Sequence, residues 1–188
     1  MPNVRSTHDS KTNESSNFRR SAADMLKGLQ TISRDDRTDT TVIEPTQLIV
    51  DNEYARVVAD FVRSAKSEIR LCAYAWRWYK NEPEIDIQKL NIELLLARSR
   101  GVKVRILVDT ELQKLTFTTL GFDARSVVNT RMLHTKAISI DDRTLILGSH
   151  NMTKRATTDN FEMSLATSEY QVVAAYMDYF DRMWHSRG

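Results

Sequence analysis

The strongest constraint on the fold is an alternation of strand-like and helix-like apolar patterns between Gln47 and Val108. Short apolar runs predict buried strands, and apolar residues three and four apart predict helices with one buried face. Strands joined by helical crossovers favour a parallel sheet, with functional groups at strand ends. We therefore expect an α/β domain with a mixed, largely parallel β-sheet flanked by helices. The expected elements are strands at Gln47–Val50, Ile69–Tyr74 and Val102–Val108, and helices at Tyr54–Ala65 and Ile87–Arg100, the latter ended by Gly101.

The length of the chain indicates one domain and an appendage. A chain of 188 residues can bury one sizeable core, and we assign that core to residues 46–188. Residues 1–45 are polar and rich in Ser, Thr and Asp, so we interpret them as an N-terminal extension. Apolar residues at helical spacing predict an amphipathic helix at about 16–34, either packed on its own domain or a dimer mate, or docking another protein. They are Phe18, Ala22, Met25, Leu29 and Ile32.

Charge and cysteine usage limit the classes of function. The formal net charge is only +2, so any phosphate site must be built locally. The single cysteine, Cys72, excludes an intramolecular disulfide framework and is expected in the core of a protein from a reducing compartment. No run reaches the ~18 apolar residues of a transmembrane helix, and the N-terminus lacks a signal-peptide core. We expect a cytoplasmic protein without membrane insertion.

Polar side chains recur at intervals of two residues in the last third of the chain. His134 and Lys136 open one β-branched run, and Ser149 and Asn151 follow the next. Residues two apart in a strand share a face, so each pair projects to one side. The intervening segment, 141–144, has turn composition. It predicts a hairpin that brings the two pairs together.

These residue types suit a phosphodiester group. Lys136 supplies a positive charge, Asn151 an amide donor and Ser149 a hydroxyl, and together they can cradle a phosphoryl group. Gly148 is expected to leave room for a ligand to approach the backbone. His134 supplies a nitrogen nucleophile that is partly neutral near pH 7.

A carboxylate downstream is expected to complete the site. Glu162 lies in a predicted strand at 160–165, in which Phe161, Met163 and Leu165 would face the core and Glu162 the site. There it can hold the tautomer of His134 by accepting a hydrogen bond from the other ring nitrogen.

The spacing His-x-Lys, four residues, Asp, six residues, Gly-Ser-x-Asn resembles the HKD motif of the phospholipase D superfamily. The similarity extends from about Leu48 to Trp184 and is greatest to the small bacterial endonucleases that carry one HKD motif per chain. The segments 65–74 and 100–109 both resemble that subgroup. The resemblance implies a phospholipase D-like fold for all but the N-terminal extension.

The resemblance also implies a mechanism. In the family, the motif histidine attacks phosphorus to give a phosphohistidine, a second histidine protonates the leaving oxygen, and water resolves the intermediate without metal or other cofactor. The family uses two motifs, but the other histidines of this chain, His8, His150 and His185, are not part of a His-x-Lys. The resemblance therefore implies a homodimer in which His134 of each subunit meets across a twofold axis.

The remaining polar residues around the motif have structural alternatives. Asp141 has the opposite strand parity to His134, and we expect it to bond turn amides or a neighbouring strand. His150 also points away from the site and is expected in the core. Five residues are candidates for substrate contacts to flanking phosphates or bases, with solvation or core packing as the alternative. They are Arg131, Lys154, Arg155, Trp76 and Arg77.

Three functions compete. The first is a metal-independent endonuclease that cleaves DNA or RNA. The second is a phospholipid phosphodiesterase, which would call for a membrane anchor or a large apolar rim. The third is a non-enzymatic nucleic-acid-binding subunit of a larger complex, against which the intact motif argues.

Overall fold

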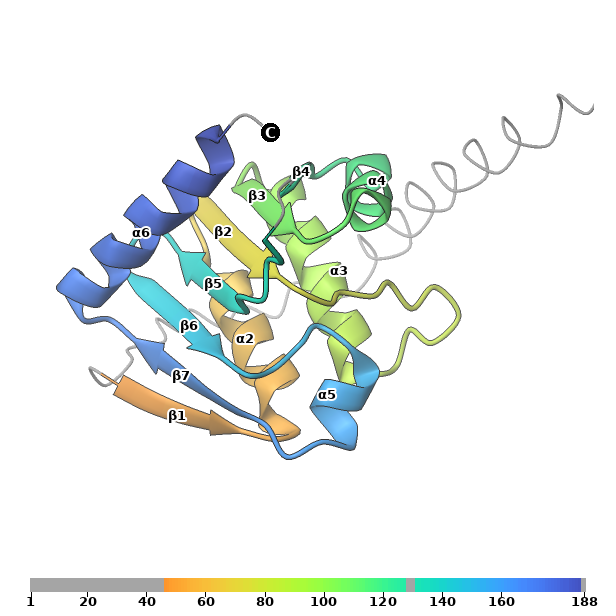
Figure 1. Ribbon diagram of the computed structural model, residues 1–188. Helices are drawn as coiled ribbons and strands as arrows, with labels where there is room; N and C mark the ends of the chain where they lie inside the picture. Colours follow the sequence, from red (N-terminus) through yellow and green to blue (C-terminus); the bar gives the residue numbers. More distant parts are fainter. Residues whose placement is uncertain (1–45, 128–130, 187–188) are drawn as a thin grey trace, which may run out of the picture.

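The computed structural model describes residues 46–127 and 131–186. A single seven-stranded sheet in this part of the chain carries helices on both faces (Figure 1). The predicted helix at 16–34 lies outside the described residues, so its packing stays a prediction. The elements in chain order are β1 (Thr46–Val50), α2 (Glu53–Ser64), β2 (Glu68–Ala73), α3 (Asp86–Ser99), β3 (Lys103–Val108), α4 (Glu111–Thr119), β4 (Asp123–Ser126), β5 (Ala137–Ile140), β6 (Thr144–Gly148), α5 (Lys154–Thr158), β7 (Met163–Thr167) and α6 (Tyr170–His185).

The sheet is mixed, with the strand order β1-β7-β6-β5-β2-β3-β4. Strand β3 runs parallel to its neighbours β2 and β4, whereas the other four pairs are antiparallel. The α/β class is therefore confirmed, but the expectation of a largely parallel sheet is wrong. The reason is that helical crossovers join parallel strands only from β2 to β4, at residues 68–126. In the second half, β5 and β6 form a hairpin, and β5 enters the sheet beside β2 in the opposite direction.

Two apolar cores lie on opposite faces of the sheet. Helices α2 and α3 pack on one face, and α6 packs on the other over β2, β3, β5 and β6. Cys72 lies under α6 and is 2% exposed, which confirms its assignment to the core. Burial raises the pKa of the Cys72 thiol to about 12, so this thiol is not a reactive group.

The far end of the β5–β6 hairpin is held by Asp141. Asp141 and Asp142 adopt positive φ values of 52° and 56°, which a tight hairpin turn requires. The Asp141 carboxylate accepts hydrogen bonds from the backbone N–H groups of Lys66 (2.7 Å), Ser67 (2.8 Å) and Glu68 (3.0 Å). Burial raises the pKa of Asp141, but the hydrogen bonds outweigh it and the net pKa is lowered. These hydrogen bonds are of the kind that the predicted structural role of Asp141 requires.

No described helix or loop covers one part of the α6 side of the sheet. Strands β1 and β7 lie at the edge of the sheet, beyond α6 (Figure 1). We define the open sheet face by four apolar residues that are 37–56% exposed. Leu165, between Leu48 and Leu147 in the register, is half-buried in the same row. The four residues are Leu48, Val50, Leu147 and Met163.

The exposure of Met163 corrects the predicted parity of β7. Ser164 and Ala166 face the α2–α3 core, whereas Phe161 is 99% exposed and Met163 56% exposed. The prediction that Phe161, Met163 and Leu165 face the core is thus wrong. A shift of one residue moves every side chain of a strand to the other face, and apolar residues on both faces of β7 left the parity undetermined.

Candidate active site

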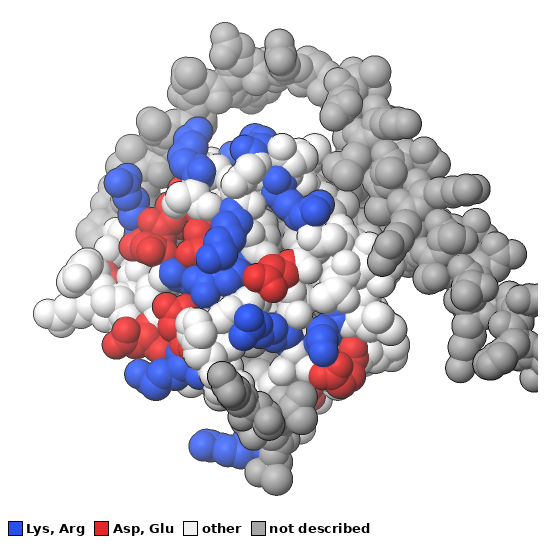
Figure 2. Space-filling model, turned by 90° about the horizontal axis from the view of Figure 1, so that it is seen from above, with Lys and Arg blue, Asp and Glu red and all other residues white. Residues whose placement is uncertain are grey.

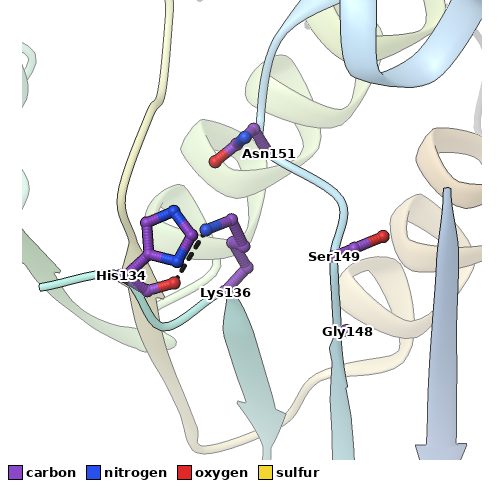
Figure 3. A pocket seen from close by; sticks show the side chains of 5 residues that line it. All are labelled: His134, Lys136, Gly148, Ser149 and Asn151. Carbon is purple, nitrogen blue, oxygen red and sulfur yellow. Dashed lines mark hydrogen bonds between the residues drawn. The ribbon is translucent and has the colours of Figure 1, made fainter. Parts of the chain in front are cut away.

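The hairpin brings the predicted polar pairs to one pocket of about 380 Å³, lined by His134, Lys136, Gly148, Ser149 and Asn151. His134 and Lys136 lie in the segment that leads into β5, and the other three lie at the end of β6 and just beyond it. The pairing between the two strands extends one residue before β5, because the Lys136 carbonyl accepts a hydrogen bond from the Gly148 N–H at 3.2 Å. Two pairs separated by twelve residues of hairpin therefore line one pocket (Figure 3).

His134 and Lys136 share an aromatic neighbour, Tyr74. The His134 ring centroid lies 4.6 Å from that of Tyr74, and the Lys136 Nζ lies 4.9 Å from the Tyr74 centroid. Lys136 also donates to the His134 carbonyl at 2.7 Å. Sequence reasoning missed Tyr74 as a site residue, although its place at the end of the strand before the loop was a usable signal.

Two effects act on the charge of Lys136. Partial burial lowers its pKa, and the nearby Glu162 carboxylate acts in the opposite direction, with a net lowering. The ammonium group thus lies in a less polar setting than on an open surface, where its field on a bound phosphoryl group is less screened by water.

Asn151 faces the same space as His134 and Lys136 (Figure 3). The amide Oδ1 of Asn151 is buried and, within the described part of the chain, lacks a hydrogen-bond partner. Buried polar atoms without a partner are rare, and one at a pocket indicates a group that a ligand or water engages. Because amide O and N are assigned rather than observed, either end of this amide can face a ligand.

Ser149 does not point at His134. Figure 3 shows its hydroxyl directed away from His134 and Lys136. The hydroxyl donates to Glu162 Oε2 and accepts from the Met163 N–H at 3.1 Å. Ser149 therefore ties the pocket segment to the start of β7.

Glu162 likewise has partners other than the predicted one. Its Oε1 accepts from Asn160 Nδ2 at 2.9 Å, and its Oε2 from Ser149. The two oxygens are thus engaged within the chain, and the predicted hydrogen bond from the His134 ring N–H to Glu162 of the same chain is not formed. The backbone of Glu162 is held by Asp51, a residue that sequence reasoning also missed.

Gly148 is required by β7 rather than by a ligand. A Cβ at this position would lie 2.3 Å from the Met163 carbonyl oxygen and 2.3 Å from Ser164 Oγ. This crowding agrees with the predicted structural role of Gly148. The prediction that the glycine leaves space for a ligand does not explain it, because a Cβ would meet β7 instead.

The tentative substrate contacts fall into two groups. Trp76 is 4% exposed, stacks on Phe117 at 3.8 Å and donates to Asn91 Oδ1 at 2.7 Å. It is a core residue, so the assignment of Trp76 to base stacking is wrong. Lys154 is exposed but forms an ion pair with Glu82. Exposed side chains that remain available to a substrate are those of Arg77, Arg131 and Arg155.

The surface charge is mixed. Figure 2 shows basic and acidic side chains intermingled on the face seen from above, in agreement with the small net charge. Among residues 46–127 and 131–186, no group of three or more His, Cys, Asp or Glu side chains is placed to hold a metal ion. No helix in these ranges is long and apolar enough to cross a membrane.

The comparison with protein families decides the identity of the domain. Residues 58–184 match the family model described as "Cardiolipin synthase, PLD-like domain". The chain belongs to the phospholipase D superfamily. Enzymes of this superfamily act on phosphodiester bonds.

The chain is similar to a cardiolipin hydrolase in sequence and to two bacterial proteins in fold. The mitochondrial cardiolipin hydrolase of Xenopus tropicalis is 26% identical over 140 residues, which are 71% of this chain and 62% of the relative. The chain thus spans less than two thirds of that relative's length. Among solved structures, Nuc of Salmonella typhimurium, a phospholipase D family member, has a TM-score of 0.61 at 23% identity and covers 74% of this chain and 94% of its own. NucT of Helicobacter pylori has a TM-score of 0.60 at 18% identity, with 75% and 96% covered.

Proposed function

We propose that this protein is a phosphodiesterase, and specifically a metal-independent endonuclease that cleaves DNA or RNA through a phosphohistidine on His134. The observation that carries the proposal is the pocket in which His134, Lys136 and Asn151 face one space. The superfamily acts on phosphodiester bonds, and the single-motif pattern of the chain resembles that of small bacterial endonucleases.

The proposed reaction has two displacements. An imidazole nitrogen of His134 forms a bond to phosphorus, the bond to the leaving oxygen breaks, and that oxygen takes a proton from the partner subunit's His134. Water then attacks phosphorus, the same partner imidazole takes the proton of the water, and the N–P bond breaks. Lys136 and Asn151 stabilise the negative charge that develops on the phosphoryl oxygens.

The proposal requires a second copy of the chain, because one chain supplies one motif histidine. The open sheet face adjoins the pocket, since the Ser149 N–H donates to the carbonyl of Met163 at 2.9 Å. A twofold contact that brings two pockets together can bury this apolar surface, which monomers in water rarely leave exposed. We therefore propose that the open sheet face belongs to the dimer interface.

The dimer is tested with Leu48→Asp and Met163→Asp. A charge in a buried apolar interface is costly, so both variants are expected to sediment as monomers and to lose turnover at low protein concentration. High protein concentration should restore part of the turnover by mass action. Leu115→Asp on α4, 63% exposed in the wild type, is the matched control and should stay dimeric. A Met163→Asp monomer with full turnover would refute the shared site.

A phospholipid substrate is the second candidate. The curated relative carries the name cardiolipin hydrolase. In addition, Met132 is 63% exposed two residues before His134, and Phe161 is 99% exposed one residue before Glu162. Such side chains can enter a lipid surface. A binding subunit without chemistry is the third reading, and the intact motif argues against it.

A substrate panel separates the three readings. Purified protein is incubated with excess chelator and labelled single-stranded DNA, double-stranded DNA, RNA or phosphatidyl lipid. We expect cleavage of a nucleic acid that survives chelation, is abolished in His134→Ala and is retained in the control His185→Ala on α6. Cleavage of the lipid alone supports the second reading. Binding without cleavage supports the third, and unchanged turnover by His134→Ala refutes the mechanism.

A further inference from the structure

Glu162 is fixed in place by Asp51, which follows β1. The Asp51 Oδ1 accepts from the Glu162 N–H at 2.9 Å, and the Asp51 N–H donates to the Glu162 carbonyl at 2.9 Å. Asp51 has a positive φ of 48°, a conformation that non-glycine residues other than Asn and Asp seldom adopt. In the turn after β1, Asp51 therefore hydrogen-bonds both the N–H and the carbonyl group of Glu162.

His150 contacts the backbone of Asp51. Its Nε2 lies 3.0 Å from the Asp51 carbonyl oxygen, and its Nδ1 lies 2.8 Å from Ser164 Oγ. A carbonyl can only accept, so Nε2 must donate and Nδ1 accepts from the Ser164 hydroxyl. The ring also stacks on Tyr54, with centroids 4.3 Å apart and planes 11° apart. Every polar atom of the imidazole is therefore satisfied in one neutral tautomer.

The position of His150 in the chain links this contact to the motif. His150 is 0% exposed and lies between Ser149 and Asn151, which line the pocket. Its side chain therefore connects the Gly-Ser-x-Asn segment to the turn at Asp51, which hydrogen-bonds the Glu162 backbone. The Glu162 carboxylate accepts a hydrogen bond from Ser149. The contacts form a closed loop from residue 149 through Glu162, Asp51 and His150.

We propose that Asp51 and His150 form a positioning unit that fixes the Glu162 carboxylate beside Ser149 and Lys136. The inference rests on the proposed function for its catalytic meaning. His150 is fully buried, and the Asp51 carboxylate and carbonyl oxygens point at Glu162 and His150, so the pair acts through Glu162 and without contact with substrate. Burial lowers the pKa of His150, which agrees with the neutral tautomer that the contacts require.

The hydrogen bond from the Glu162 N–H to the Asp51 carboxylate is tested with Asp51→Gly and Asp51→Asn. Glycine tolerates the positive φ but removes the carboxylate, whereas asparagine keeps both the conformation and an oxygen acceptor. We expect the Glu162 amide hydrogen to exchange with solvent at least about tenfold faster in Asp51→Gly than in wild type, because its acceptor is gone. Asp51→Asn should restore the protection. Asp142→Gly, at the other positive-φ aspartate turn, is the matched control and should leave Glu162 unchanged.

Kinetics then test the effect on the site. We expect Asp51→Gly to lower kcat roughly 10- to 100-fold with KM nearly unchanged, because a misplaced site group impairs chemistry more than binding. In a Glu162→Gln background the same substitution should cost little more, since its effect passes through Glu162. Equal losses in both backgrounds, or unchanged exchange at Glu162, would overturn the inference. Turnover by His134→Ala would refute the proposed function instead, and the exchange measurement would still decide the contact.

Discussion

The two ends of the β5–β6 hairpin contain residues of one motif but differ in how their polar atoms are used. At the turn, Asp141 accepts from three backbone N–H groups of a neighbouring segment. At the open end, the Asn151 Oδ1 is buried without a partner in the described structure, and His134 is exposed. Saturated hydrogen bonding marks architecture, and unsatisfied groups around a pocket mark a place for a ligand. One motif therefore contains both a structural turn and the residues of the pocket.

The largest expected effect concerns the open end. Lys136→Met keeps the length of the side chain but removes its charge. We expect kcat to fall about 10²- to 10³-fold, the usual loss for one electrostatic stabiliser of a transition state, with the melting temperature close to that of wild type. Steady-state kinetics and thermal unfolding measure the two. A Lys136→Met variant that lost stability but kept its kcat would show that Lys136 has a structural role and not a catalytic one.

The turn should show the opposite pattern. Asp141→Ala removes the acceptor of three backbone donors and places alanine at a positive φ. We expect the free energy of unfolding to drop by about 1 to 3 kcal/mol and kcat per folded molecule to stay within about twofold. Urea unfolding and active-site-normalised kinetics are the measurements. Loss of kcat at wild-type stability would move Asp141 back among the catalytic groups.

The pH dependence of stability sharpens the same point. The pKa of Asp141 is lowered in the folded protein, so its ionised form stabilises the fold. This contribution is complete above the unfolded pKa of about 4 and is lost as the pH falls through the lower, folded pKa. The difference in free energy of unfolding between wild type and Asp141→Asn should therefore narrow as the pH falls from about 5 to the acid limit of folding. A constant difference would exclude the carboxylate as its origin.

The smallest expected effect concerns Tyr74, which contacts His134 and Lys136 at the open end. Tyr74→Leu removes the ring that contacts His134 and Lys136, and we expect kcat to fall about two- to fivefold, the value of one exposed cation–π contact. Tyr74→Phe keeps the ring and should retain kcat. Equal losses in both variants would point to the hydroxyl group instead.

Local features of the fold follow from the sequence because short segments determine them. The predicted strands and helices of the first half agree with β1, α2, β2, α3 and β3, and Gly101 adopts φ 92° at the end of α3. The buried positions of Cys72 and His150 also agree with the prediction. These outcomes depend on periodicity and turn chemistry, which neighbouring residues carry.

Features that depend on contacts between residues far apart in the chain could not be predicted from the sequence. The insertion of β5 beside β2 makes most strand pairs antiparallel, and no local pattern specifies that neighbour. Glu162 was predicted as a site residue, but its partners Ser149 and Asp51 follow β6 and β1 and lie more than ten residues away in the chain. The sequence leaves Trp76 open between a substrate contact and core packing, because its acceptor, Asn91, lies on α3 and no local pattern reveals that contact. Each of these assignments needed the tertiary arrangement.

The stereochemistry at phosphorus tests the central claim most directly. The measurement uses an oligonucleotide with one chiral phosphorothioate, cleaved in isotopically labelled water, and determines the configuration of the product. Two in-line displacements through a phosphohistidine on His134 predict net retention. Inversion would mean that water attacks phosphorus in a single step, and it would contradict the covalent role of His134.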